Sequence, residues 1–225
     1  MDMKSVSILE EFKKMKVGEN AEQTEEKKPE SIEVKLSRAG IPKRYINSSF
    51  EQITKTGCPE TVRSLAEIAY RYSNRLKENI KQGRGLLFYG EVGLMKTTLA
   101  CCVAREAVRQ GVGVYFISMP ELLDAMTVMS RNKDPAEFRA FEDRIKHVSI
   151  LILDDFGAEY PAGWVLNKVD AIITNRYNNM LPTIITTNML PDEIDERYVK
   201  RVFDRLRSTS TMVGAYGKSL RGDAG

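Results

Sequence analysis

The sequence predicts an α/β fold in which a parallel sheet is covered by helices on both faces. Short apolar runs rich in β-branched and aromatic residues recur along the chain, at 86–89, 112–117, 149–153 and 183–187. Segments of helix length, with apolar residues at three- and four-residue spacing, separate these runs. The runs do not alternate apolar with polar residues, as is typical of strands buried on both faces.

Length and composition allow one good-sized domain and a short appendage. The chain has 225 residues, of which 42% are hydrophobic and 29% are charged, the balance of a globular protein. No stretch approaches the roughly 18 apolar residues of a membrane helix, and charges interrupt the N-terminus where a signal peptide has an apolar run. We therefore expect a cytoplasmic protein with no membrane partner. A net charge of +3 is too mild by itself to indicate nucleic-acid binding.

Residues 1–35 are expected to form the appendage. Apolar residues at helical spacing predict a short amphipathic helix over 5–16, and residues 18–31 have the polar, charged composition of a flexible linker. A helix this short is marginal alone. It either docks on a partner or belongs to a disordered tail. We place the boundary near 32–40 and the main domain at 36–225.

The main domain is expected to begin with helices and continue as alternating strands and helices. A long helical pattern runs from Pro59 to Gly83. The expected elements after it are a strand at 86–89, a helix at 97–110, a strand at 112–117, helices within 120–146, a strand at 149–153, a helix at 164–179, a strand at 183–187 and a helix carrying RVFDRLR.

A glycine-rich loop, GEVGLMKTT, joins the strand at 86–89 to the helix that follows. It fits the phosphate-loop pattern G-x-x-x-x-G-K-[ST] except at Met95, where the pattern has glycine. In this strand–loop–helix setting, backbone N–H groups at the helix N-terminus bind a phosphate chain. Lys96 would contact the terminal phosphates of ATP, and the Thr97 hydroxyl would ligate Mg²⁺. The residues expected to bind the nucleotide are Gly90, Glu91, Val92, Gly93, Leu94, Met95, Lys96, Thr97 and Thr98.

Met95 is expected to weaken this site. The glycine that it replaces allows a backbone conformation in which a β-carbon is crowded, at a cost on the order of 1–3 kcal/mol. If all of that strain arose on binding, affinity would fall roughly 5–150-fold. ATP binding is expected to survive, whereas hydrolysis is more vulnerable because it depends on exact placement of the γ-phosphate. Two explanations of Met95 remain open: the protein is a weakened or slow ATPase that still binds nucleotide, or Met95 is a single deliberate or accidental change in the sequence.

Polar residues follow two further strands. ILILDD ends in Asp154, which would hold Mg²⁺ through water, and Asp155, which would orient the attacking water. Read alone, the pair could be an exposed turn, but beside the phosphate loop we interpret it as functional. TIITTN ends in Asn188, either a turn former or an amide that contacts the γ-phosphate or the water.

Three arginines, Arg201, Arg205 and Arg207, lie on the helix that carries RVFDRLR. A run of this kind is usually a solvated face. The functional alternative is an arginine finger that acts on the nucleotide of a neighbouring subunit.

Taken in order, these stretches resemble the ATPase domain of DnaC/DnaI-type replicative helicase loaders and the related IstB-type transposition helpers, both in the AAA+ superfamily. The similarity covers about residues 36–221. It is carried by AGIPKRYINSSFEQI, GEVGLMKTTLA, LILDDFGAE, NRYNNMLPTIITTN, RVFDRL and GKSLR. Six ordered matches are far more specific than any one of them.

The resemblance implies an AAA+ P-loop NTPase core with a five-stranded parallel sheet in the order 5-1-4-3-2, and ATP with Mg²⁺ bound between subunits of a homo-oligomer. On this transfer Asn188 is sensor 1, Arg205 the arginine finger and Arg221 a possible sensor 2. The implied function is loading of a DnaB-type replicative helicase onto single-stranded DNA. The alternatives are an IstB-like transposition helper and a hydrolysis-impaired, nucleotide-binding helicase adapter.

In loaders of this kind, a helix inserted between the second strand and the acidic strand faces the DNA. The corresponding segment here spans 120–147. Its basic residues could contact phosphates, but its acidic residues nearly balance them. The basic residues are Arg131, Lys133, Arg139, Arg144 and Lys146, and the acidic ones Asp134, Glu137, Glu142 and Asp143.

Overall fold

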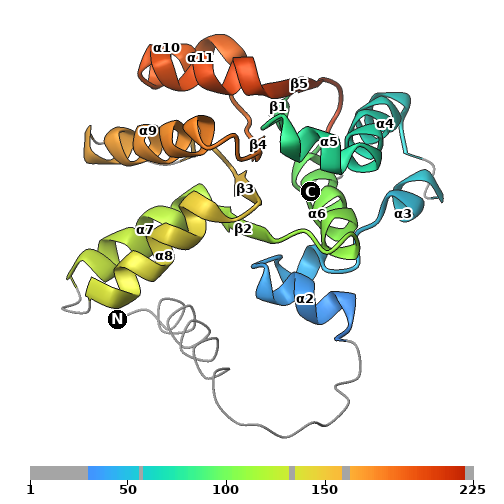
Figure 1. Cartoon of the computed structure of the whole chain (residues 1–225). Coiled ribbons are helices and arrows are strands. Elements are labelled where there is room, and N and C mark those ends of the chain that lie inside the picture. Colours follow the sequence, from blue (N-terminus) through green and yellow to red (C-terminus); the bar gives the residue numbers. More distant parts are fainter. Residues whose placement is uncertain (1–29, 56–57, 132–134, 159–162, 221–225) are drawn as a thin grey trace, which may run out of the picture.

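The computed structural model describes residues 30–55, 58–131, 135–158 and 163–220 (Figure 1). Its centre is a parallel five-stranded sheet with the order β2-β3-β4-β1-β5. This is the strand order that the family resemblance implied, and the α/β class predicted from the sequence is confirmed. The strands are β1 (Gly85–Gly90), β2 (Val114–Ser118), β3 (Ile150–Asp154), β4 (Thr183–Thr186) and β5 (Ser210–Ala215).

Helices cover both faces of the sheet, which produces three layers (Figure 1). One face packs against α2 (Ile32–Arg38), α3 (Phe50–Lys55), α4 (Glu60–Asn74), α5 (Leu76–Lys81) and α6 (Lys96–Arg109). The other packs against α7 (Met119–Arg131), α8 (Pro135–His147), α9 (Gly163–Asn178), α10 (Pro191–Arg197) and α11 (Lys200–Thr209). A single 3₁₀ turn, η1 (Lys43–Tyr45), lies between α2 and α3.

Alternation along each strand divides the core into two clusters. In β1, Leu86 and Phe88 belong to the cluster that includes α4 and α6, whereas Leu87 belongs to the cluster on the opposite face. All three side chains are fully buried. Because successive side chains point to opposite faces and both faces are covered, a central strand must be apolar at every position. This explains the continuous apolar runs in the sequence.

Strand β5 is the element that hydrophobic patterning does not locate. Its residues, STMVGA, are only partly buried, and it lies at the edge of the sheet, paired with β1 alone. An edge strand has one neighbour and less contact with the covering helices, so its sequence carries a weaker apolar signal. The fifth strand was expected only from the family resemblance.

The long helix predicted from Pro59 to Gly83 is wrong as a single element. It is broken between α4 and α5 at Arg75, whose φ and ψ of −107° and 26° leave the helical region. The break is held by side chains: Nδ2 of Asn79 donates to the carbonyl of Tyr72 at 3.0 Å, and the Tyr72 hydroxyl donates to the carbonyl of Arg84 at 2.7 Å. The Asn79 bond adds to the one that the Tyr72 carbonyl accepts from the backbone amide of Arg75 at 3.1 Å, and the Tyr72 hydroxyl ties α4 to the residue before β1.

Helix α2 lies across the predicted domain limit at residue 35. The Ser31 hydroxyl caps it, and its Leu36 side chain is buried against the layer that contains α6. A backbone bond of 2.7 Å from Phe116 N to Ala39 O then ties the following residue to the outer edge of β2. Residues from α2 onward therefore pack with the main domain. The helix predicted at 5–16 lies outside the described residues.

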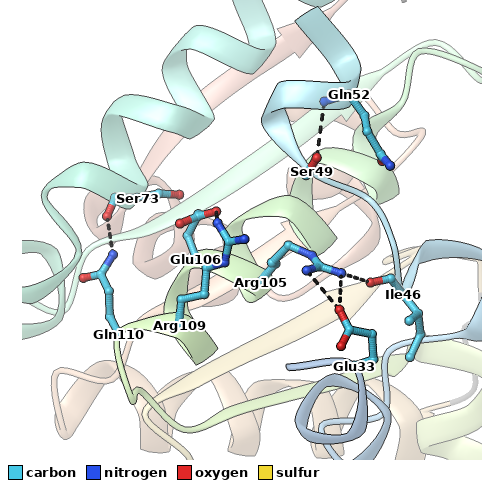
Figure 2. A network of polar contacts seen from close by, with 9 residues as sticks. All are labelled: Glu33, Ile46, Ser49, Gln52, Ser73, Arg105, Glu106, Arg109 and Gln110. Carbon is cyan, nitrogen blue, oxygen red and sulfur yellow. Dashed lines mark hydrogen bonds and ion pairs between the residues drawn. The ribbon is translucent and has the colours of Figure 1, made fainter. Parts of the chain in front are cut away.

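A buried arginine fastens α2 and the segment after it to α6 (Figure 2). Arg105 is 7% exposed; both of its terminal nitrogens lie 3.4 Å from Glu33 Oε1, and Nη2 also donates to the carbonyl of Ile46 at 2.5 Å. Nearby, the exposed Arg109 pairs with Glu106 along the same helix. Arg105 thus joins three segments of the chain.

In the part of the chain that the structure describes, no helix has the length and apolar character needed to span a membrane.

Candidate nucleotide-binding site

The phosphate loop lies between β1 and the N-terminus of α6, the setting predicted from the sequence. Its two glycines are required by the backbone. Gly90 has φ +109°, and a β-carbon there would lie 2.3 Å from the carbonyl oxygen of Ala215; Gly93 has φ +84°. The amide of Glu91 donates to the same Ala215 oxygen at 2.9 Å. The loop is therefore held tightly against the end of β5, with no room for side chains at the glycines.

Lys96 occupies the centre of this loop. Its Nζ donates to the carbonyls of Gly90 and Glu91, at 2.7 and 2.6 Å, and the residue is only 7% exposed. The ammonium is thus held by two carbonyls of the loop backbone. A phosphate chain bound by this loop would meet the positive charge together with the N-terminus of α6.

The other loop residues differ in what they can offer a nucleotide. Leu94 is 2% exposed and packs in the core, so only its backbone can face a phosphate. Glu91 and Val92 are exposed, and Thr97 and Thr98 are partly buried in the first turn of α6.

Met95 has the left-handed conformation that the missing glycine would adopt. Its φ and ψ are 60° and 17°, and it is the residue that caps the N-terminus of α6, without a side-chain hydrogen bond to the helix. A non-glycine residue in this region is disfavoured by about 1–2 kcal/mol because its β-carbon approaches the following carbonyl. The side chain packs against the core cluster beneath α6. The strain is thus a property of the folded backbone, and part of its cost falls on folding stability.

The two acidic residues after β3 differ in environment. Asp154 is 7% exposed and Asp155 is exposed, with φ +52°. The hydroxyl of Thr186, at the end of the neighbouring β4, donates to Asp154 Oδ1 at 2.5 Å and accepts from the backbone amide of Asp155 at 3.1 Å. One residue on β4 thus fixes both acids at the carboxyl edge of the sheet.

The surroundings of Asp154 fit a Mg²⁺ site. Burial raises the pKa of its carboxyl, while the hydrogen bond from Thr186 and the nearby Thr97 hydroxyl act in the opposite direction. A buried carboxylate without a cation is costly, and a divalent ion would favour its ionised form. Thr97 and Asp154, the two predicted metal ligands, are therefore neighbours, as a P-loop magnesium site requires.

The C-terminal part of the described chain returns to the phosphate loop. The amide of Leu220 donates to the carbonyl of Gly93 at 3.2 Å, and the amide of Gly217 donates to Glu91 Oε2 at 2.9 Å. We call residues 216–220 the closing tail. Arg221, the possible sensor 2, lies outside the described residues, but the residue before it contacts the loop.

Asn188 follows β4 and is exposed. The preceding residue, Thr187, is fully buried and holds the turn: its amide donates to the carbonyl of Phe88 at 2.9 Å and its hydroxyl to the carbonyl of Phe156 at 2.5 Å. These bonds join the ends of β1, β3 and β4. Asn188 therefore emerges at the carboxyl edge that also carries the phosphate loop and Asp154, and its sensor role stays a prediction.

The arginines of RVFDRLR lie on α11, as predicted, and two of them contact α9. Arg201 binds both carboxylate oxygens of Asp170, while Nη1 of Arg205 lies 2.7 Å from Thr174 Oγ1 and 3.3 Å from Asp170 Oδ1. Arg207 is exposed. Neither helix belongs to the layer of α6. The finger role of Arg205 stays a prediction.

The segment predicted to face DNA forms the hairpin of α7 and α8 (Figure 1). Two of its basic side chains are used within the fold. Arg144 donates to the carbonyl of Arg38 at 2.8 Å and lies over the ring of Tyr115, and Lys146 pairs with Glu142 at 3.3 Å. Arg139 is exposed. Lys133 lies outside the described residues, as does Asp134.

Sequence reasoning missed Thr186, Asp170 and the bonds between the closing tail and the phosphate loop, although GKSLR at 217–221 was among the matched stretches. Thr186 had a usable signal, because it is a polar residue at the end of a buried strand, and the carboxyl ends of parallel strands share one edge. Asp170 had none, since an acidic residue in a helix is ordinarily solvent-facing.

Comparison with known proteins agrees with this geometry. The chain is 27% identical over 121 residues to the replicative helicase loader DnaI of Bacillus subtilis (strain 168), which is 52% of this chain and 37% of the loader. It is 25% identical over 203 residues to the putative ATP-binding protein of insertion sequence IS5376 from Geobacillus stearothermophilus, covering 87% of this chain and 75% of that protein. The chain thus aligns with little more than a third of the loader's length.

Solved structures share the fold. A DnaC helicase loader superimposes with a TM-score of 0.67 at 25% identity, over 78% of this chain and all of that chain. AMPPCP-bound DnaA from Aquifex aeolicus superimposes with a TM-score of 0.61 at 20% identity, over 80% of this chain and 53% of that one, a likeness of fold alone. The family model described as IstB-like ATP binding protein matches residues 10–223. With its phosphate loop, buried acidic strand end and AAA+ sheet order, the chain belongs to the IstB-like ATP-binding protein family.

Proposed function

We propose that this chain is a Mg²⁺-dependent ATPase that works as a homo-oligomer and loads a DnaB-type replicative helicase onto single-stranded DNA. The observation that carries the ATPase part is the meeting of three groups at one sheet edge: the ammonium of Lys96 inside its loop, the Thr97 hydroxyl, and the buried carboxylate of Asp154. The resemblance to the helicase loaders DnaI and DnaC supports the choice of partner.

Each residue has a defined part in this proposal. The loop amides and Lys96 hold the phosphates, while Thr97 and Asp154 hold Mg²⁺, which stabilises the charge that develops on the transferred phosphoryl group. Asp155, exposed beside Asp154, orients the attacking water. Asn188 contacts the γ-phosphate or that water from the end of β4. Arg205 acts on the nucleotide of a neighbouring subunit, and Arg221 contacts the phosphates from beyond the closing tail.

ATP binding and turnover test the enzymatic part. We expect a fluorescent ATP analogue to bind the purified protein in the presence of Mg²⁺, and Lys96→Ala to abolish this binding. The matched control is Lys77→Ala, which removes an exposed lysine on α5. Phosphate release, with and without single-stranded DNA, measures turnover. Binding that is unaffected by Lys96→Ala would overturn the assignment of the site.

Helicase loading is tested separately. A DnaB-type hexamer should be captured by this protein and transferred to circular single-stranded DNA in an ATP-dependent way, read out by unwinding of an annealed strand. We propose residues 1–35 as the helicase-docking element. A chain that lacks residues 1–29 should therefore keep ATP binding and lose capture of the helicase. Loading that requires neither this protein nor ATP would contradict the proposal.

A transposition helper is the second candidate. It is favoured by the similarity to the IS5376 protein, which extends over a larger share of this chain than the similarity to DnaI. A helper of this kind acts on duplex DNA. A preference for duplex over single-stranded DNA that persists across a salt series would favour it over the loader. A protein that binds ATP and captures the helicase without turnover would instead be a hydrolysis-impaired adapter.

A further inference from the structure

Two arginines of α11 converge on one carboxylate of α9. Asp170 Oδ1 accepts from Arg201 Nε at 2.9 Å, and Oδ2 accepts from Arg201 Nη2 at 2.5 Å, so Arg201 binds in the bidentate manner. Oδ1 also accepts from Arg205 Nη1 at 3.3 Å and from the Thr174 hydroxyl at 3.3 Å. The carboxylate therefore accepts four hydrogen bonds, three from arginines of α11 and one from Thr174 of α9.

The exposure of these groups shows which of them is held in place. The side chains of Asp170 and Arg205 are 12% and 24% exposed, whereas that of Arg201 is 61% exposed. Arg205 also donates to Thr174 Oγ1 at 2.7 Å, and its guanidinium lies 5.7 Å from the centre of the Tyr177 ring. Asp170, Thr174 and Tyr177 are spaced by four and three residues, so they line one stripe of α9 along which the Arg205 side chain lies.

The contacts on Arg205 use only one of its nitrogens. Both hydrogen bonds, to Asp170 and to Thr174, involve Nη1. Among the described residues, Nη2 and Nε of Arg205 make no hydrogen bond, so these donors remain available to an anion. A guanidinium presents donors in a rigid fork. Because the guanidinium is rigid, the two bonds to Nη1 also set the direction in which Nη2 and Nε point.

The charge balance also matters. A carboxylate beside a phosphate-binding arginine would repel the phosphate if its charge were uncompensated. Here Arg201 compensates Asp170 by taking both oxygens, and the group of Asp170, Arg201 and Arg205 keeps a net positive charge. The arrangement can orient Arg205 without cancelling its attraction for an anion.

We propose that Asp170 is a positioning residue that orients Arg205 toward the triphosphate bound by a neighbouring subunit, with Arg201 as the counter-charge and Thr174 as the second anchor. This rests on the proposed function, because it requires that Arg205 acts in trans. A misplacement of about 1 Å in a catalytic group costs roughly a hundredfold in rate. We therefore expect Asp170→Asn to lower ATP turnover by about tenfold to a hundredfold, less than the complete loss of the finger, which is worth about 10³–10⁵.

Subunit mixing tests this directly. A Lys96→Ala subunit cannot bind nucleotide but carries an intact Arg205. When it is mixed with Arg205→Ala subunits, whose nucleotide sites are intact, turnover should recover. A failure of this control mixture would count against a finger acting in trans, and so against the proposed function itself.

The same mixture made with Asp170→Asn in place of Arg205→Ala should recover turnover equally well, because the supplied Arg205 is correctly held. Asp170→Asn mixed with Arg205→Ala should not recover. If the control mixture recovers and the Asp170→Asn mixture does not, Asp170 acts on its own subunit's site or on folding, and the inference is overturned. Turnover at the wild-type rate in Asp170→Asn alone would overturn it as well.

Two further variants guard against a folding defect. Thr174→Val removes the 2.7 Å contact with Arg205 and the 3.3 Å bond to Asp170 but keeps both bonds between Arg201 and Asp170, while Thr174→Ser keeps the hydroxyl. We expect a several-fold loss of turnover with valine and recovery with serine, at unchanged ATP affinity. Asp195→Asn, which neutralises an exposed carboxylate on α10, should leave turnover unchanged. Equal rates for the valine and serine variants would contradict the anchoring role.

Discussion

The hydroxyl of Thr186 donates a hydrogen bond to the carboxylate of Asp154, so the last residue of one strand fixes the last residue of its neighbour. The same hydroxyl accepts from the backbone amide of Asp155, so Thr186 contacts the carboxylate of one acid and the backbone of the next. In metal sites, loss of a group that hydrogen-bonds to a metal ligand typically lowers metal affinity or activity by about 10–100-fold. Thr186 has this relationship to the proposed Mg²⁺ site.

Thr186→Val tests this relationship, since valine keeps the shape and removes the hydroxyl. We expect the Mg²⁺ concentration for half-maximal ATP turnover to rise about tenfold. The free energy of unfolding should fall by about 1–3 kcal/mol, because a buried charged group loses a hydrogen bond. Thr211→Val, at an exposed position of β5, is the control. An unchanged Mg²⁺ dependence in Thr186→Val would contradict the role.

Replacement of Met95 tests the strain at the phosphate loop. Met95→Gly should raise the free energy of unfolding by up to about 1 kcal/mol, because glycine adopts a left-handed conformation without the β-carbon penalty. It should also raise ATP affinity and turnover, because the loop proposed to hold the phosphates would no longer carry the strain of a β-carbon at this position. Urea denaturation and ATP titration are the measurements.

Met95→Ala is the matched control, since alanine removes the thioether and keeps the β-carbon. It should show neither the gain in stability nor the full gain in turnover. Equal turnover in the wild-type protein and Met95→Gly would show that the strain does not reach the nucleotide.

Arg105 is expected to matter for stability far more than Arg109, four residues further along α6. Arg105→Lys cannot contact Glu33 and the Ile46 carbonyl at once, so we expect a loss of about 1–3 kcal/mol in the free energy of unfolding. Arg109→Lys alters an exposed pair with Glu106 and should change stability by less than about 0.5 kcal/mol. Similar losses of stability for the two variants would contradict the proposal that Arg105 holds α2 and the segment after it to α6.

The pH dependence of stability reports on Asp170. The hydrogen bond from Arg201, together with its charge, holds the pKa of the Asp170 carboxyl below its ordinary value. The ionised carboxylate therefore stabilises the fold above the ordinary pKa of about 3.9, and this contribution is lost as the pH falls through the lowered value. The difference in unfolding free energy between wild type and Asp170→Asn should be constant near neutral pH and shrink below about pH 4.

Arg201→Met supplies the control for this titration, because it removes the group that lowers the pKa. In that background, Asp170→Asn should produce a smaller pH-dependent difference. A difference that grows as the pH falls would have the wrong sign.

The fold and the phosphate loop could be predicted because each depends on local sequence. Four strands are buried on both faces and must be continuously apolar, and the loop has a fixed spacing of glycines, lysine and threonine. Other features depend on contacts between distant residues. The break at Arg75 is held by Tyr72, Asn79 and the carbonyl of Arg84, none of which marks a helix end by itself.

The partly exposed edge strand β5 and the pairing of Asp170 with α11 escape local reasoning for the same reason. Met95 is the opposite case, because the phosphate-loop pattern alone shows that this position usually holds glycine. The structure adds that Met95 has a positive φ, a conformation that glycine adopts more readily.

The closing tail links the phosphate loop to the C-terminal part of the described chain. Leu220 and Gly217 bond to the loop proposed to bind the phosphates, although they follow that loop in the sequence by most of the length of the domain. We therefore expect a ligand that reshapes the loop to alter these two bonds with the closing tail. A reporter dye attached just beyond residue 220 would sense loop occupancy, and a bulky fusion at that end would hinder it.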